Sequence, residues 1–227
     1  MKTNPANAYR NGPLYATYTA VAMKGLLDLR GELRVNLAAM MSWSFEFEGK
    51  DYFEGFRTLA TNGIDKPILN VFRMAGMMSG DRVETVSSGQ IPLDDILKSG
   101  VRQSPDVDAF ATKSGHEAAV MVWNYHDDDL PASPASVQVT IEGIPTAVKR
   151  VMLEHYRIDD MHSNANTNWK QMGSPQAPTT EQYERLRRAG QLELLTSPRW
   201  LDVDHGKVTI ETELPRQATS LLRLQWQ

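Results

Sequence analysis

The chain has 227 residues, of which 41% are hydrophobic and 23% are charged, and its formal net charge is −4. This composition is typical of a globular protein with a substantial core, and a weakly acidic, scattered charge argues against binding to nucleic acid. The absence of cysteine excludes disulfides, thiolate catalysis and thiolate-bound metals, and no apolar run of about 18 residues is present that would span a membrane.

The first third of the chain has the pattern of an α/β structure. Residues 4–13 contain Asn, Gly and Pro in combinations that are typical of loops. Apolar residues then recur at helical spacing from Leu14 to Leu29, which predicts a helix that stops at Gly31. A second helix is predicted over residues 68–78, because Pro67 suits the first turn of a helix.

A strand is predicted between these two helices. Residues 37–41 form a continuous apolar run, and residues 42–48 then alternate aromatic and carboxylate side chains. A continuous run is typical of a strand that is buried on both faces in a parallel sheet. One such strand with two helices cannot cover both of its own faces, so we expect neighbouring strands from outside this chain.

The pattern changes near residue 79, where short β-prone runs separated by turn residues begin. Their spacing predicts an antiparallel β-sandwich. The predicted strands are residues 82–87, 107–112, 118–125, 136–142, 148–156, 207–212 and 220–226. Thr179 or Thr180 suits the N-cap of a helical insertion near residues 180–195. We therefore predict two domains, residues 1–78 with α/β structure and residues 79–227 with β structure.

Several stretches of the chain resemble one known family. They are Asn4-Pro5 with residues 7–15, then residues 42–48, 52–56, 63–67 and 70–72, and finally residues 162–164, Trp169 and residues 172–178. In this order they resemble glycoside hydrolase family 39, the β-xylosidase and α-L-iduronidase group. The resemblance implies a (β/α)8 TIM barrel joined to a β-sandwich. It also implies that this chain carries the last helices and the eighth strand of that barrel, followed by the sandwich.

The resemblance further implies retaining hydrolysis of terminal β-xylosyl or related bonds. This reaction uses two carboxyl groups about 5 Å apart, and the family carries them as glutamates on the fourth and seventh barrel strands, the acid/base glutamate after an Asn. No Asn-Glu pair occurs in this sequence, and the nucleophile strand is expected just before residue 1. We therefore assign no catalytic residue, and we expect the chain alone to be inactive until a barrel-bearing segment completes it.

Two carboxylates, Glu46 and Glu48, lie at the end of the predicted eighth strand, where barrel enzymes place their active sites. Two residues apart on a strand, they would share one face, with Cα atoms about 6.5–7 Å apart. Three interpretations stay open. The two residues contact sugar hydroxyls, they are plain charges at a strand end, or they are a substitute catalytic pair, which their origin in one strand disfavours.

Aromatic residues near these carboxylates are further candidates. Trp43 is either the platform under a sugar ring or a core residue that closes the barrel. Phe53 and Phe56 are predicted to form either a pocket wall or ordinary loop packing. Tyr9 and Arg10 follow the expected nucleophile strand and either reach the site or belong to a plain loop. The predicted substrate-binding residues are thus Trp43, Glu46, Glu48 and Phe53.

No metal or cofactor is expected. The histidines, at positions 116, 126, 155, 162 and 205, lack the spacing of metal ligands, and Asp127–Asp129 lacks the remaining positions of a calcium loop. The sequence contains no phosphate loop, no dinucleotide fingerprint and no nucleophile elbow.

A different class of function stays open for the sandwich, which is that of a non-catalytic carbohydrate-binding module or of a structural module for oligomerisation. A flat exposed face of Trp123, Tyr125, Trp169 and Trp200 favours sugar binding, whereas burial opposes it. Trp123 follows an apolar run and is predicted to face inward. The expected partners are a xyloside or a short xylo-oligosaccharide, with a homo-oligomer as one alternative, and not nucleic acid or a membrane. The sequence does not assign a compartment, and it favours a soluble location, cytoplasmic or periplasmic, over a membrane.

Overall fold

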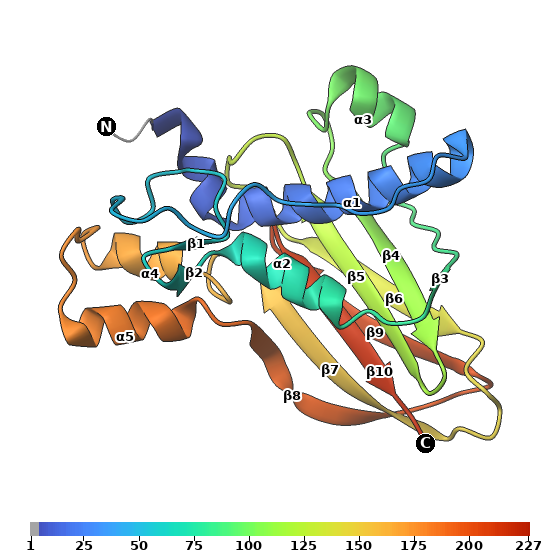
Figure 1. The fold of residues 1–227 in the computed structure, drawn as a ribbon. Coiled ribbons are helices and arrows are strands. Elements are labelled where there is room, and N and C mark those ends of the chain that lie inside the picture. Colours follow the sequence, from blue (N-terminus) through green and yellow to red (C-terminus); the bar gives the residue numbers. More distant parts are fainter. Residues whose placement is uncertain (1–4) are drawn as a thin grey trace.

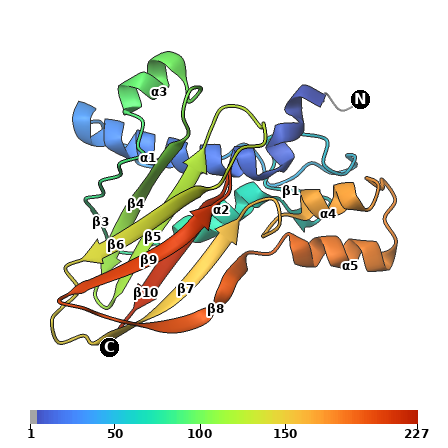
Figure 2. The same cartoon turned by 180° about the vertical axis from the view of Figure 1, so that it is seen from behind.

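The computed structural model describes residues 5–227 and has three layers (Figures 1 and 2). Helices α1 (Pro13–Leu33) and α2 (Pro67–Gly76) cover one face of a six-stranded antiparallel sheet, and a two-stranded sheet packs on the other face. The mixed α/β character and the antiparallel sheets predicted from the sequence are confirmed. Asn4, in the predicted N-terminal loop, lies outside the described residues.

The large sheet has the strand order β3-β4-β5-β10-β7-β8, so strands that are far apart in the chain lie side by side. Its strands are β3 (Asp81–Val83), β4 (Asp106–Ser114), β5 (Glu117–Tyr125), β10 (Thr219–Gln225), β7 (Arg150–Ile158) and β8 (Glu193–Asp202). The small sheet pairs β6 (Ala135–Glu142) with β9 (Lys207–Leu214) over their full lengths. The two sheets therefore stack in the manner of a sandwich, with the helices as an outer layer.

Strand β5 illustrates how the core is built. Successive side chains of a strand point to opposite faces, and in β5 both faces are apolar. Met121 and Trp123 belong to the apolar cluster that includes Ala20 of α1, whereas Val120 belongs to the cluster that includes Ile210 of β9. Trp123 is 1% exposed, which confirms its predicted inward orientation. A central antiparallel strand covered on both faces thus has the continuous apolar run that is typical of parallel sheets.

Both helices predicted in the first part of the chain form. Helix α1 begins at Pro13, runs through Gly31 and ends at Leu33, and the C-cap residue Arg34 has left-handed backbone with a φ of 53°. A glycine inside a helix costs about 1 kcal/mol relative to alanine, and the packing of α1 on the sheet outweighs this cost. The predicted stop at Gly31 is therefore wrong. Helix α2 begins at Pro67, as predicted.

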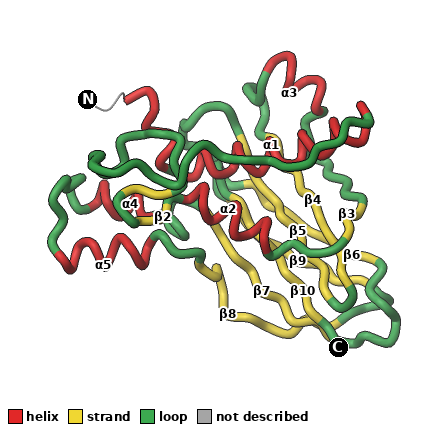
Figure 3. Tube along the Cα trace, in the orientation of Figure 1, coloured by secondary structure: helices red, strands yellow, loops and turns green. Residues whose placement is uncertain are grey.

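The strand predicted at residues 37–48 does not form in the described structure. In Figure 3 this segment is drawn as loop, and its one contact of strand type is an isolated parallel bridge between Ser44 and Thr58. Met41 is 90% exposed and Trp43 is 75% exposed. A buried strand needs neighbours for its backbone hydrogen bonds, and residues 5–227 place no ladder beside this apolar run. This described part of the chain also contains no closed barrel.

Shorter elements also differ from the predicted pattern. Residues Pro5–Asn11 form a 3-10 helix, η1, and not a loop. Strand β3 covers the start of the strand predicted at residues 82–87. Beyond it, the hydroxyls of Thr85 and Ser87 donate to carbonyl oxygens of β4 in place of a backbone ladder. Two helices were not predicted, α3 (Leu93–Ser99) and α4 (Ala165–Gln171).

The predicted helical insertion is α5 (Thr180–Ala189), and Thr179 caps it. The Thr179 hydroxyl accepts a hydrogen bond from the backbone N–H of Gln182, whose side-chain oxygen accepts from the Thr179 N–H. This is the reciprocal capping box. The predicted extension to Leu195 is wrong, because β8 begins at Glu193 and adds an edge strand beside β7.

Residues on both sides of position 79 share one core. Val71 and Met74 of α2 lie in the same apolar cluster as Phe110 of β4 and Leu221 of β10. Gly190, which follows α5, lies so close to the hairpin of β1 (Ala60–Thr61) and β2 (Ile64–Asp65) that an added Cβ would meet the Asp65 carbonyl oxygen at 2.7 Å. The segment between α1 and β3 is thus packed against both the sheet and the helical insertion.

Candidate functional site

The predicted substrate residues are spread over one exposed segment and one buried position. Trp43 is 75% exposed, and Glu48 is also exposed. The Oε2 atom of Glu46 accepts a hydrogen bond from the backbone N–H of Gly63 at 2.9 Å, which ties the segment to the turn between β1 and β2. Because residues 45–48 form no strand, the expected common strand face of Glu46 and Glu48 is absent.

Phe53 lies in the core and not at a surface. It is 4% exposed, and its ring centroid is 5.0 Å from that of Trp169. Ile64 and Leu186 complete the same apolar cluster. Of the two interpretations of Phe53, loop packing is therefore the one that agrees with its position. Phe56 contacts Phe47 edge-on at 5.4 Å, which also makes it a packing residue.

A small cavity behind this segment contains the buried amine of Lys66. The Nζ atom donates to the Phe56 carbonyl oxygen at 3.1 Å and to the Thr58 hydroxyl at 2.9 Å. Burial lowers the pKa of Lys66 to about 8, and burial also raises the pKa of nearby Glu54. The cavity has a volume of about 10 Å³, enough for one water molecule at most. These groups therefore serve local structure and do not form a ligand site.

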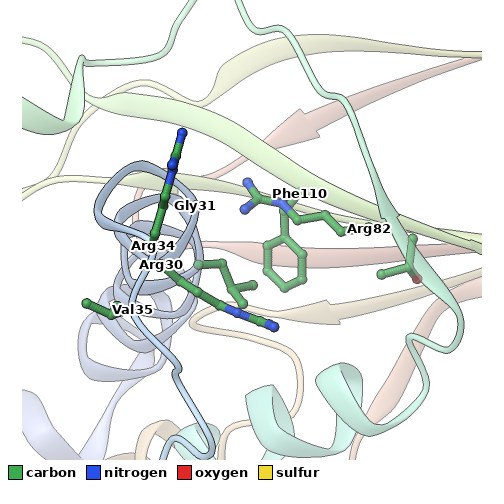
Figure 4. Close-up of a pocket in the computed structure, with 8 residues that line it drawn as sticks. Arg30, Gly31, Arg34, Val35, Arg82 and Phe110 are labelled. Carbon is green, nitrogen blue, oxygen red and sulfur yellow. The ribbon is translucent and has the colours of Figure 1, made fainter.

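A larger cavity, of about 480 Å³, lies at the C-terminal end of α1 (Figure 4). Arg30, Arg34, Arg82 and Phe110 line it. Arg82 is paired with Asp28 at 2.5 Å, and Figure 4 shows Arg34 pointing away from the other two guanidinium groups. Diverging guanidiniums do not clamp one anion. Cations at this end of a helix complement its dipole, so Arg30 and Arg34 act as helix-end charges, whereas Arg82 of β3 pairs with Asp28.

A third cavity, which we name the tyrosine pocket, lies where the start of α1 meets the end of β5. It has a volume of about 460 Å³ and is lined by Tyr9, Leu14, Tyr15, Tyr18, Arg57, Tyr125, Asp127 and Asp129. Tyr15 and Tyr18 stack at 6.3 Å with an interplanar angle of 11°. Its size lies within the range of about 300–1,000 Å³ that is usual for small-molecule sites. Of its lining residues, Tyr9 and Tyr125 were predicted as candidates from the sequence, and Asp127 and Asp129 were weighed there as part of a calcium loop.

The polar side of the tyrosine pocket is partly organised. The Tyr125 hydroxyl donates to Asp127 Oδ1 at 3.0 Å, and the Val101 N–H donates to Asp127 Oδ2 at 3.0 Å. Burial and the neighbouring Asp127 carboxylate raise the pKa of Tyr125. Burial likewise raises the pKa of Tyr15. Both phenols are therefore neutral donors at physiological pH.

The most buried polar cluster lies inside the large sheet. Arg157 donates to the Ser220 hydroxyl at 2.8 Å, and Nε2 of His155 lies 2.9 Å from the same oxygen. Arg157 also pairs with Asp159 at 3.4 Å, and Asp159 accepts from His162. His155, Arg157 and Asp159 are each at most 5% exposed, and none of them lines a cavity described above. The cluster satisfies buried polar groups and has no access for a substrate.

Neither a metal cluster nor a spanning helix occurs in the described part of the chain. Among residues 5–227, no three His, Asp or Glu side chains are grouped so that they could hold a metal ion. None of the helices in this range is both long and apolar enough to cross a membrane. The aromatic face considered for the sandwich does not form, because Trp123 and Tyr125 are 1% and 5% exposed while Trp200 is 48% exposed.

The fold is that of known glycoside hydrolases. A monomeric β-xylosidase from Caulobacter crescentus CB15 superposes with a TM-score of 0.72 at 18% identity, over 98% of this chain and 43% of that one. The GH39 enzyme from Xanthomonas axonopodis pv. citri superposes with a TM-score of 0.74 at 17% identity, over 98% of this chain and 42% of that one. These likenesses establish the fold.

The family follows from the sequence comparisons. The model of glycosyl hydrolases family 39 matches residues 2–200. A β-xylosidase from Caldicellulosiruptor saccharolyticus is 25% identical over 92% of this chain, and a mouse α-L-iduronidase is 27% identical over 66% of it. The chain therefore belongs to glycosyl hydrolase family 39. It spans 39% of the length of that β-xylosidase and 23% of that iduronidase.

Proposed function

We propose that this chain forms part of a retaining glycoside hydrolase that removes terminal β-xylosyl or related residues. Within that enzyme, residues 1–78 are the last part of a (β/α)8 barrel and residues 79–227 are the attached β-sandwich. Family membership supports the glycoside hydrolase class. The β-xylosidase relative, which matches 92% of this chain, supports a xyloside over a uronide.

One observation carries the proposal for the barrel. Helices α1 and α2 pack against each other and run in the same direction in Figure 1, so residues 34–66 must cross back between them. A strand between two parallel helices does this in each repeat of a (β/α)8 barrel. The crossing segment carries the apolar run of residues 37–41 and makes a parallel bridge at Ser44. These features suit a barrel strand that pairs when neighbouring strands are present.

The high exposure of the crossing segment supports the same proposal. Val35, Met41, Trp43 and Phe45 are all more than half exposed. So many exposed apolar side chains in one segment are unusual on a monomeric protein and mark an interaction surface. We infer that it is covered by the remaining barrel strands, in one polypeptide or in a complex. Assembly of two copies through this surface is the alternative, and light scattering with and without a barrel-bearing segment separates the two.

The roles of the site residues follow from this arrangement. Trp43 and Glu48, which are exposed, are available to contact a sugar when the barrel is closed. Glu46, held by Gly63, is available through its second carboxylate oxygen. Phe53 backs the segment from the core, through its contact with Trp169. The acid/base and the nucleophile come from barrel strands that precede this segment.

The test is hydrolysis of 4-nitrophenyl β-D-xylopyranoside. We expect no turnover by the 227-residue chain and turnover when it is co-expressed with the barrel segment of the Caldicellulosiruptor saccharolyticus β-xylosidase that its match does not cover. Replacing the two Glu46 and Glu48 carboxylates by amides, Glu46→Gln and Glu48→Gln, should raise KM in the complemented enzyme more than it lowers kcat. Enzyme-like turnover by the chain alone would contradict the assignment of the catalytic carboxylates.

A further inference from the structure

The tyrosine pocket has exposed aromatic rings that are not part of the buried core. Tyr9 is 37% exposed and Tyr18 is 48% exposed. Tyr9 meets Tyr15 edge-on at 6.2 Å and 84°, and Tyr18 lies 6.2 Å from Tyr125 at a tilt of 51°. The rings therefore support one another in a continuous curved wall, with parts of Tyr9 and Tyr18 open to solvent. Such a wall presents flat, weakly polar surfaces to a ligand.

The wall is assembled from distant parts of the sequence. Tyr15 and Tyr18 are three residues apart on α1, which places them on neighbouring positions of one helix surface. Tyr9 comes from the preceding η1 helix, and Tyr125 from the end of β5. Because α1 packs on β5, the wall is held by the rigid part of the fold. A site on packed helices and strands is more precise than one on loops.

Polar groups with unused hydrogen-bonding capacity also line the pocket. Among residues 5–227, the side chains of Arg57 and Asp129 have neither a hydrogen-bond partner nor an ion-pair partner, and both are exposed. Asp127 is already held by Tyr125 and Val101, with Arg102 3.7 Å away. Arg57 thus offers donors and Asp129 offers acceptors, next to the phenol groups.

The mixed charge of the lining narrows the class of ligand. Arg57 opposes a bound cation, and Asp127 with Asp129 opposes a bound anion. A neutral molecule with many hydroxyl groups can use the donors and the acceptors together. Its apolar C–H faces would cover the tyrosine rings, which removes them from water. A pyranose sugar has both properties, whereas an apolar ligand would leave the charged groups without partners.

We propose that the tyrosine pocket is a binding site for a short neutral saccharide. Tyr18 is the ring on which a sugar stacks, and Asp129 and Arg57 bind its hydroxyl groups. The choice of a xylo-oligosaccharide as the first probe rests on the proposed function. The saccharide class itself rests on the lining of the pocket.

The experiment measures binding of xylotetraose and cellotetraose to the 227-residue chain by isothermal titration calorimetry. We expect binding that is weakened about tenfold or more by Tyr18→Ala, as for other aromatic anchors that a ligand covers. Tyr18→Phe should keep most of the affinity, and Asp129→Ala should weaken it. The matched control is Trp200→Ala, because Trp200 is also 48% exposed but lies on β8 and lines a different cavity. This control should bind like the unchanged chain.

Several outcomes decide the proposal. Absence of binding for both saccharides would overturn it, as would a Tyr18→Ala variant that binds normally while its unfolding free energy is unchanged. Tighter binding of tetramethylammonium than of either saccharide would also overturn it, because aromatic cages of that kind select cations. Binding of cellotetraose alone would support the pocket and contradict the xyloside assignment. Binding needs no turnover, so failure here is separate from failure of complementation.

Discussion

The Nζ atom of Lys24 on α1 lies 3.0 Å from Asp108 Oδ2 on β4, and the two side chains are 10% and 5% exposed. Lys24 also pairs with Asp28 at 2.9 Å. Burial alone lowers the pKa of Lys24, but the hydrogen bonds and charges of the two carboxylates outweigh it, so the pKa is raised. This ammonium group therefore anchors the helix layer to the large sheet by a charge that is shielded from water.

Removing the Lys24 charge should destabilise the fold strongly. Lys24→Met leaves the Asp108 carboxylate buried without its cation, and its Oδ1 already lacks a hydrogen-bond partner. We expect a loss of about 3 kcal/mol or more in the free energy of unfolding, measured by urea denaturation. Lys98→Met is the control, because Lys98 and its partner Asp94 are 72% and 82% exposed. Equal effects of the two substitutions would contradict the anchoring role.

The imidazole of His155 should make stability depend on pH below neutrality. Burial, with the nearby charge of Arg157, lowers the pKa of His155 from 6.5 to about 4. Between these values the unfolded chain binds a proton that the folded chain does not, so the free energy of unfolding falls as the pH decreases. Above pH 6.5 both states are neutral and this contribution is constant, and the loss from pH 6.5 to 4 is about 3 kcal/mol.

The measurement for His155 is a series of urea denaturations across this range. The variant His155→Gln keeps an amide that can reach the Ser220 hydroxyl, and it should flatten the dependence on pH relative to the unchanged chain. His205→Gln is the matched control, because His205 is 92% exposed. A variant that keeps the full dependence on pH would assign the effect to carboxylates elsewhere.

The capping box of α5 gives a more local prediction. Thr179→Ala removes the acceptor of the Gln182 N–H and should lower the free energy of unfolding by about 1 kcal/mol. Thermal unfolding followed by circular dichroism measures the change. The neighbouring Thr180 lies inside the helix and is exposed, so Thr180→Ala should change stability by less than about 0.5 kcal/mol. The prediction fails if the two substitutions have the same effect.

Trp43 should contribute to association and not to stability of the chain. Because it is 75% exposed, Trp43→Ser should change the free energy of unfolding by less than about 0.5 kcal/mol. It should, however, reduce the binding of a hydrophobic dye and the tendency of the chain to aggregate. Trp123→Ser, at a position 1% exposed, should instead destabilise the fold by several kcal/mol, of the order of 3–5 for loss of a buried Trp. A strongly destabilised Trp43→Ser variant would show that the ring is buried.

The sequence predicts an element correctly where its apolar pattern matches the elements that cover it in the fold. Residues 118–123 have apolar side chains at every position, and β5 has partners on both sides. Residues 37–41 have an equally apolar run, yet they lie on the surface. The apolar pattern of a segment indicates which side chains it can bury, but it does not indicate whether neighbouring segments are present to cover them. Helix α3 escaped prediction because it is only 7 residues long, so that Leu93, Ile96 and Leu97 give too short an apolar period to identify a helix.

The predicted substrate residues and the tyrosine pocket differ, for a related reason, in how far the sequence predicts them. Trp43, Glu46 and Glu48 were found because they are close in sequence and match a family pattern, and their roles stay predictions. The tyrosine pocket joins Tyr18 to Tyr125, more than a hundred positions away, and no local pattern predicts that contact. The spacing of Tyr15 and Tyr18 was the available signal, because it places two aromatic rings side by side on one helix.

The position of β10 determines the order in which the fold can be completed. This strand, the last of the described elements, lies between β5 and β7 at the middle of the large sheet. During synthesis the pairs β4–β5 and β7–β8 are two separate ladders until residues 219–225 leave the ribosome. Until then, each ladder has one unpaired inner edge. An exposed edge of this kind invites pairing with other chains. The nascent chain is therefore most prone to misassembly just before β10 arrives.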